Sequence, residues 1–358
     1  RNAVLTAALI SAGVESLQLF SAVRQPSIVD FVTNTGGALA GAVIVLLAIA
    51  YVRRARNVRS FVGIPAALVA VPYGLVVLLE SFGSLFRQER LPVWGGPLER
   101  FSAARAQIDP SSLWSIPWFD ILLFAPAGSF AVAALVERQL SYRGAAILVT
   151  FVGSAALCLA EIARGFAGYP IAYGPMLAHA AGIGIGAALA ASTLAGLSVR
   201  LRGAERPLAL LVLYCALVAL WSWRPFALEV SLSGVAAKLS GEHLLPLRAY
   251  LDRVDLFTAV DVQMSFLLFV PLGSLLAVWP LRLEGPLRHF LPGVYVAVAV
   301  ELGQVLLMGR WFDVTDILVH SAAVALGWVI VRRAGFRPYG QVLTPAPHPT
   351  SARSRPQR

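Results

Sequence analysis

Residues 301–320, ELGQVLLMGRWFDVTDILVH, gather polar side chains between two apolar runs. The stretch contains carboxyl, amide, guanidinium and imidazole groups, on Glu301, Gln304, Arg310, Asp313, Asp316 and His320. A guanidinium beside carboxyl groups can hold a phosphate or pyrophosphate while an acid transfers protons. This stretch is therefore the first candidate for a ligand-binding site.

The spacing of these residues places them on facing helix surfaces. Glu301 and Gln304 are three residues apart, and Asp313, Asp316 and His320 follow the i, i+3, i+7 pattern of a single helix face. The connection is short enough to hold the two helices as antiparallel neighbours, so the two faces can meet. Charges at membrane depth cost about 3 kcal/mol each and tend to pair. We therefore expect Arg310, in the turn, to pair with Glu301.

Two interpretations of this stretch stay open. In the first, Asp313 and Asp316 only cap a helix whose N-terminus favours anions, and the other charges pair. In the second, the same groups bind a ligand or act in catalysis. The spacing matches no metal motif such as HExxH, and the sequence has no nucleophile triad pattern or phosphate-cradling glycine loop. We predict no metal site and no cofactor, and we leave enzymatic activity and catalytic residues undetermined.

The elements that position these groups follow from the composition. Hydrophobic residues make up 58% of the 358-residue chain and charged residues 13%, whereas about a quarter of the residues in soluble domains are charged. Roughly 20 apolar residues span a bilayer as a helix. We therefore predict an all-α fold, a polytopic transmembrane helical bundle with about ten membrane helices. The expected spans are 3–20, 31–52, 61–82, 118–136, 144–163, 176–198, 207–223, 262–280, 290–308 and 314–331.

Every second connection between these spans is rich in arginine. The basic connections are 51–59, 136–143, 199–206, 280–289 and 331–337. Cytoplasmic loops of membrane proteins favour Lys and Arg, so we predict a multi-pass protein of the plasma (inner) membrane with these connections inside. Residues 301–320 then face outward.

The formal net charge of +10 does not indicate nucleic-acid binding. The arginines are dispersed over helix ends and do not form one basic face with interleaved aromatic residues. We exclude nucleic acid as a partner. Membrane lipids are the expected partners, through contacts between arginine and anionic headgroups.

The polar residues of 301–320 recur near the start of the chain. ESLQLFSAVRQPSIVDFVTNTGGALAG (15–41) aligns without a gap with ELGQVLLMGRWFDVTDILVHSAAVALG (301–327). Matching positions carry identical polar residues in an apolar background, which favours an internal repeat. The ligand-binding candidates of this first copy are Glu15, Gln18, Arg24, Asp30 and Asn34.

A third, diverged copy lies between these two. Glu161 and Arg164 close one apolar run, and FDILLFAPAG (119–128) resembles MSFLLFVPLG (264–273). This copy has no acids at the places of Asp313 and Asp316. The predicted domains are the second half of a unit at 1–55, a diverged unit at 61–200, a unit at 207–335 and a disordered tail at 338–358. The half unit predicts that a preceding half was cut off or lost.

The combined pattern resembles the VanZ-like family of membrane proteins. It consists of Phe-x-Pro-x-Gly in one span, Glu-x-x-Gln ending another, an Arg, and Asp-x-x-Asp before a small-residue helix. Residues 255–331 cover a whole family unit, and 1–52 cover its second half. Ser265 and His320 stand where the family usually has Asn, and Ser27 stands where it has Asp, so the copies need not be equivalent ligand sites.

The resemblance implies a polytopic envelope protein. The family's namesake is associated with low-level resistance to the glycopeptide teicoplanin, and the family has no settled biochemical activity. We expect recognition of an amphiphilic or lipid-linked cell-envelope molecule at the extracytoplasmic face, either a lipid-linked precursor or a glycopeptide, with a link to antibiotic resistance. A membrane transporter or flippase and a structural partner of an envelope protein are the alternatives.

Two longer external segments, 83–117 and 224–261, separate spans of the diverged and complete units. Residues 232–257 mix apolar and charged residues, which is typical of a helix lying in the membrane interface. Such a segment can act as a lid over the polar turns or as a surface anchor, and the sequence leaves both open.

Overall fold

The computed structural model describes residues 63–81, 108–109, 117–166, 171–200, 205–229, 231–239, 244–246, 256–279 and 286–336, with scattered helical positions between 12 and 53. The chain divides into two compact units, residues 1–57 with 333–335 and residues 58–332 with 336–358. The predicted first-copy spans lie in the first unit, largely outside the described residues. The second unit contains the elements discussed below.

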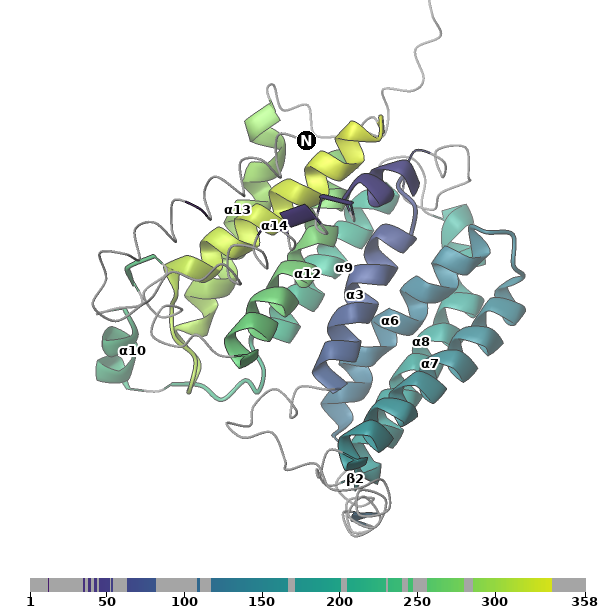
Figure 1. Ribbon diagram of the computed structural model, residues 1–358, viewed down its shortest axis with the longest axis horizontal. Coiled ribbons are helices and arrows are strands. Elements are labelled where there is room, and N and C mark those ends of the chain that lie inside the picture. Colours follow the sequence, from purple (N-terminus) through teal and green to yellow (C-terminus); the bar gives the residue numbers. More distant parts are fainter. Residues whose placement is uncertain are drawn as a thin grey trace, which may run out of the picture. The chain divides into compact units, whose positions relative to one another are not determined.

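The described part of the second unit is built from helices (Figure 1). In chain order they are α3 (Ala67–Ser81), α6 (Trp118–Val136), α7 (Tyr142–Phe166), α8 (Tyr173–Arg200), α9 (Glu205–Ser222), α10 (Leu232–Lys238), α12 (Leu256–Val278), α13 (Pro286–Gln304) and α14 (Val314–Arg333). Two-residue strands β1 (Ile108–Asp109) and β2 (Ile171–Ala172) form one short parallel pair, which the sequence did not predict.

Membrane-spanning length and composition confirm the predicted fold class. Six helices within the described residues are long and apolar enough to cross a membrane: α6, α7, α8, α9, α12 and α14. Helix α3 and the Phe290–Gln304 part of α13 are shorter apolar helices. Each of these eight falls within or overlaps a span expected from hydropathy, so the chain is an all-α bundle of the membrane type.

The polar turn begins earlier than the sequence predicted. Helix α13 ends at Gln304, four residues before the expected end of that span at 308. The following backbone pairs instead with the segment after α9, through a bridge between Leu228 and Leu307 and a hydrogen bond from Glu229 N–H to Leu306 C=O of 2.9 Å. Gly309 then turns the chain at a positive φ of 70°, which glycine adopts at little cost.

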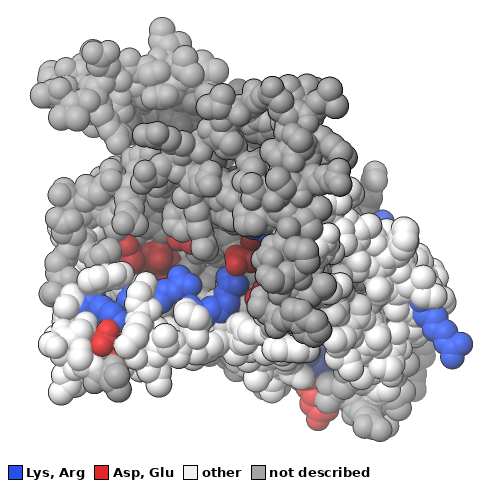
Figure 2. Space-filling view, turned by 90° about the horizontal axis from the view of Figure 1, so that it is seen from below, with Lys and Arg blue, Asp and Glu red and all other residues white. Residues whose placement is uncertain are grey.

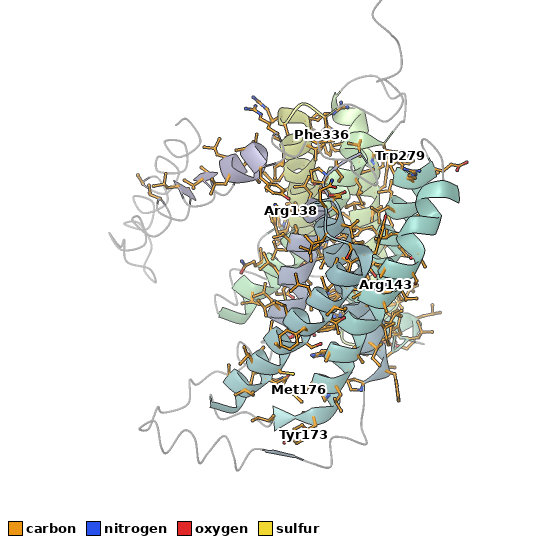
Figure 3. The ribbon with its side chains drawn as sticks, turned by 90° about the vertical axis from the view of Figure 1, so that its right-hand side faces the viewer. Arg138, Arg143, Tyr173, Met176, Trp279 and Phe336 are labelled. Carbon is orange, nitrogen blue, oxygen red and sulfur yellow. The ribbon has the colours of Figure 1, made fainter. Side chains whose placement is uncertain are left out.

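The turns between helices lie at two opposite ends of the bundle. Figure 3 shows Arg138, in the α6–α7 turn, toward one end, together with Trp279 just after α12. Tyr173 and Met176, at the start of α8, lie at the opposite end. The arginine-rich α6–α7 turn and the start of α8 are therefore at opposite ends of the bundle.

The helices approach each other closely at glycines. A Cβ atom at Gly186 of α8 would collide with the Ala125 carbonyl of α6, and one at Gly327 of α14 would collide with the Val270 carbonyl of α12. Small residues permit this proximity of backbones in membrane bundles. These two glycines thus allow direct contact between the backbones of the paired helices.

Helices α3, α6 and α8 are joined by the same hydrogen bonds as helices α9, α12 and α14. Tyr73 donates a hydrogen bond to Leu123 C=O (2.6 Å), and Tyr214 donates to Leu268 C=O (2.8 Å). Ser129 donates to Gly186 C=O (2.9 Å), and Ser274 donates to Gly327 C=O (3.4 Å). These residues occupy corresponding places in FDILLFAPAG and MSFLLFVPLG and their neighbours. A duplicated unit stays a prediction, and these contacts support it.

Candidate functional site

Helix ends meet around a polar pocket at the end of the bundle opposite the α6–α7 turn. The pocket has a volume of about 150 Å³ and is lined by the last turns of α3, α9 and α13, the first four turns of α12, the first turns of α14, and the segments after α9 and α13. Its ionisable lining residues are Glu80, Arg224, Asp261, Arg310, Asp316 and His320. Figure 2 shows positive and negative side chains gathered side by side at this end. The apolar bundle therefore carries a charged, concave surface.

An ion pair joins two helices at the pocket wall. The Arg224 guanidinium donates to the Glu80 carboxylate (Nη1 to Oε1, 3.0 Å), and its central carbon lies 4.5 Å from the Trp221 ring centroid. Both charged side chains are about a quarter or less exposed, at 21% and 25%. Arginine is suited to this position because its planar cation can pair and stack at once.

Arg310 has a different partner from the one that the sequence suggested. Its Nη2 donates to the Arg224 carbonyl (3.3 Å), and the described contacts contain no ion pair between Arg310 and Glu301. The charge of Arg310 acts on Glu301 from a greater distance, as do those of Asp313 and Asp316. The predicted pair of Arg310 and Glu301 is wrong because the segment after α9, which is distant in sequence, supplies the Arg224 carbonyl as the acceptor.

Glu301, Gln304 and His320 form a buried polar layer next to the pocket. The Glu301 side chain is fully buried, and its Oε1 accepts a hydrogen bond from Gln304 (3.0 Å). The same oxygen lies 3.8 Å from His320 Nδ1. Among the described residues, Glu301 Oε2 and His320 Nδ1 have no hydrogen-bond partner. Because Gln304 and His320 both line the pocket, Glu301 can position two of its walls.

Asp313 and Asp316 have separate roles at the start of α14. Asp313 is buried, and its Oδ1 accepts from Thr315 N–H (2.7 Å), which is the hydrogen bond of an N-cap. Asp316, in the first turn, lines the pocket. The capping interpretation thus accounts for Asp313, and Asp316 contributes to the pocket wall.

The corresponding layer in the diverged region has its charges paired within the protein. Glu161 accepts from Arg164 (2.6 Å), and His179 Nε2 lies 3.2 Å from Asp120 Oδ2. His179 stacks on Phe124 with ring centroids 3.9 Å apart, as His320 stacks on Phe269 at 3.9 Å.

Two differences in sequence change the chemistry of this layer. Gln304 stands where the diverged region has Arg164, and Ser265 stands where it has Asp120. Glu301 therefore receives an amide and no arginine, and His320 lacks the carboxylate that His179 has. Buried ionisable groups are inexpensive only when they are paired. The α12–α14 layer is consequently the one whose groups remain available to a ligand.

A short clasp, formed by residues 226–229, 231–239 and 305–308, holds the connection after α13. Lys238 is buried and donates to Leu307 C=O (2.5 Å) and Val305 C=O (3.4 Å), and its Nζ lies 3.7 Å from Glu229 Oε2. Hydrogen bonds from the Ser231 hydroxyl and N–H lower the pKa of Glu229, with a further contribution from the Lys238 cation. Within the predicted interfacial segment 232–257, α10 is a helix of only seven residues.

Replacing Lys238 by methionine should release this clasp without unfolding the bundle. The apolar stem is kept, but two carbonyls and Glu229 lose their cation, and hydrogen bonds from charged groups are worth about 1.5 to 3 kcal/mol. We expect amide hydrogen exchange over 232–238 to accelerate by about tenfold or more, with an unchanged midpoint of thermal unfolding. Arg143→Met, at the other end of the bundle, is the control, and equal exchange in the two variants would contradict the role of Lys238.

The structure assembles most of the candidate residues of the complete unit. Gln304, Arg310, Asp316 and His320 line the pocket, and Glu301 and Asp313 lie next to it. The first-copy candidates fall outside the described residues: Glu15, Gln18, Arg24, Asp30 and Asn34.

Sequence reasoning missed three ionisable lining residues. They are Glu80, Arg224 and Asp261. Each lies within six residues of the outer end of an apolar helix, as Gln304 lies at the end of α13. A survey of polar residues at the outer ends of all spans would have found them.

Comparison with known proteins gives one family assignment. Residues 208–335 match the family model VanZ/LLP1. Neither the search of curated proteins nor the search of solved structures gave a match. The match spans α9, α10, α12, α13 and α14, the elements that supply most of the pocket. Residues 208–335 are thus similar to the VanZ-like family, as the polar motifs of the sequence indicated.

Proposed function

We propose that the pocket recognises the polar headgroup of an amphiphilic or lipid-linked molecule of the cell envelope. The observation that carries this proposal is a charged pocket of about 150 Å³ formed by helix ends of a membrane-type bundle. A headgroup can enter such a pocket while its apolar chain stays in the surrounding lipid. The exposed apolar side chains of Leu306, Met308 and Trp311, which flank Arg310, suit that arrangement.

The orientation of the bundle supports recognition at the outer face of the plasma membrane. The arginine-rich α6–α7 turn, with Arg138, lies at the end opposite the start of α8 (Figure 3). The pocket is formed by the ends of α3 and α9 and the starts of α12 and α14. Because positive connections favour the cytoplasm, we place the pocket outside in a multi-pass topology.

The family supplies a context for this activity. The namesake of VanZ-like proteins is associated with resistance to teicoplanin, and glycopeptides act at the outer face of the envelope. We propose that binding an envelope amphiphile at this pocket alters the sensitivity of the cell to such antibiotics. A glycopeptide itself, or a lipid-linked precursor, would present its polar group to the same side chains.

Recognition fits the pocket better than transport does. A transporter or flippase requires access from both faces, and transporter sites lie near the bilayer midplane. Within the part of the chain that the structure describes, the charged lining residues come from one end of the bundle. A purely structural partner would not need the charged pocket.

Binding of short-chain phospholipids and of a polyprenyl phosphate to the purified protein tests the proposal. Arg310→Gln removes a guanidinium that donates one hydrogen bond to the Arg224 carbonyl, so we expect at least a tenfold rise in Kd, or about 1.4 kcal/mol. Arg143→Gln is the matched control and should bind as the wild type does. Equal affinity of Arg310→Gln and wild type for every probe, at equal thermal stability, would rule out headgroup recognition at this pocket.

A further inference from the structure

The charges that line the pocket do not favour a simple anion. Two cations, Arg224 and Arg310, are accompanied by three carboxylates, Glu80, Asp261 and Asp316. A headgroup with only a negative charge would add a fourth anion to this set. Like charges at close range repel more strongly where water is partly excluded. The described lining is therefore better suited to a ligand that brings a positive charge as well.

The cations of the pocket differ in what they offer to a ligand. Arg224 is engaged by Glu80 at 3.0 Å and stacks on Trp221. Arg310 uses one N–H for the Arg224 carbonyl at 3.3 Å, and a guanidinium has five N–H donors in a planar fork. Arg310 can thus still form a forked pair with a phosphate oxygen.

The carboxylates of α12 and α14 offer the opposite charge nearby. Asp261 lies near the start of α12 and Asp316 in the first turn of α14, and both line the same pocket as Arg310. Both acids also interact with other groups of the protein. An ammonium group of a ligand can donate hydrogen bonds to several carboxylates, because it has three donors that rotate freely. The pocket therefore presents a phosphate-binding and an ammonium-binding group together.

The volume of the pocket limits the headgroup to a small one. A cavity of about 150 Å³ is known to hold a molecule the size of benzene, and this pocket has about that volume. A phosphate linked to an amine through two carbons is of this order of size, with the remainder of the lipid outside. A disaccharide with an attached peptide would not fit within it.

We infer that the pocket selects a zwitterionic headgroup of the phosphoethanolamine type, with its phosphate on Arg310 and its ammonium on Asp316 and Asp261. This inference rests on the proposed function and names the class of ligand that the site takes. Selectivity over an anionic headgroup arises from the excess of carboxylates, and selectivity over a cationic one arises from Arg310.

The test compares two phospholipids that differ only in the headgroup. Dihexanoyl phosphatidylethanolamine and dihexanoyl phosphatidylglycerol are titrated into the purified full chain, and Kd is measured by isothermal calorimetry. We expect the ethanolamine lipid to bind at least tenfold more tightly. Free phosphoethanolamine should compete more weakly than the lipid, and equal competition would show that the headgroup alone is the ligand.

Three variants separate the groups that produce this selectivity. Asp316→Asn, alone and combined with Asp261→Asn, should remove most of the preference by weakening ethanolamine-lipid binding and leaving glycerol-lipid binding equal or tighter. Arg310→Gln should weaken both lipids. Glu205→Gln, at the start of α9 and hence at the opposite end, is the control for removing an acid and should change neither affinity.

The outcomes distinguish this inference from the proposed function. If wild-type protein binds the glycerol lipid as tightly as the ethanolamine lipid, or more tightly, zwitterion selectivity is overturned, and Arg310-dependent binding of either lipid still supports headgroup recognition. Wild-type binding that Arg310→Gln does not change would overturn both. The wild-type comparison alone decides selectivity if the aspartate variants do not fold.

Discussion

Gly327→Ala is expected to destabilise the protein by about 3 kcal/mol, the upper end of the usual cost of overpacking a core. The added methyl group would meet the Val270 carbonyl of α12 at a distance that no real Cβ contact shows, and it would also lie 2.9 Å from Ser274 N. The obstacle is backbone, so rotation of a side chain cannot relieve it, and α12 and α14 must separate. We would measure the midpoint of thermal unfolding and the elution profile of the detergent-purified protein.

Gly74→Ala is the matched control for this prediction. A Cβ atom at Gly74, inside α3, has nothing within 4 Å, and alanine is favoured over glycine within a helix by up to about 1 kcal/mol. Its stability should equal or exceed that of the wild type. Gly186→Ala, which meets the Ala125 carbonyl, should behave like Gly327→Ala. Wild-type stability of both Gly327→Ala and Gly186→Ala would contradict close packing at these glycines.

The helices of this bundle could be predicted because they depend on local properties of the sequence. Runs of apolar residues of membrane-spanning length locate α6, α7, α8, α9, α12 and α14. Helical spacing also brought together Glu301, Gln304, Asp316 and His320, since they lie on the facing surfaces of two helices joined by a short connection. Periodicity and a short loop sufficed for that part of the site.

The rest of the site depends on contacts between distant parts of the chain. Glu80 and Arg224 are 144 residues apart, and no spacing rule relates them. The partner of Arg310 is a backbone carbonyl supplied by the segment after α9, and pairing of Leu307 with Leu228 ends α13 early. In each case a residue distant in the chain determines the partner of a side chain or the end of a helix, and the local sequence does not specify that residue.

The same substitution at two corresponding glutamates should give opposite results. Glu161→Gln is expected to lower the free energy of unfolding by about 2 to 3 kcal/mol, because it leaves the largely buried Arg164 without its anion, and breaking buried pairs is costly. Arg164 is 17% exposed and Glu161 is fully buried. Headgroup binding should be unchanged, since neither residue lines the pocket. Chemical or thermal unfolding and the lipid titration measure the two quantities.

Glu301→Gln should instead leave the stability of the protein almost unchanged and weaken ligand binding. No arginine pairs with Glu301 among the described contacts, and the amide oxygen of a glutamine can still accept from Gln304, so the cost to stability is small. The new amide N–H would compete for the space facing His320 Nδ1 and reorient two pocket walls, His320 and Gln304. We expect the Kd for the phospholipid probe to rise at least tenfold. Unchanged affinity together with unchanged stability would show that the buried layer next to the pocket has no part in binding. The isosteric change from carboxyl to amide would then have no consequence for either quantity.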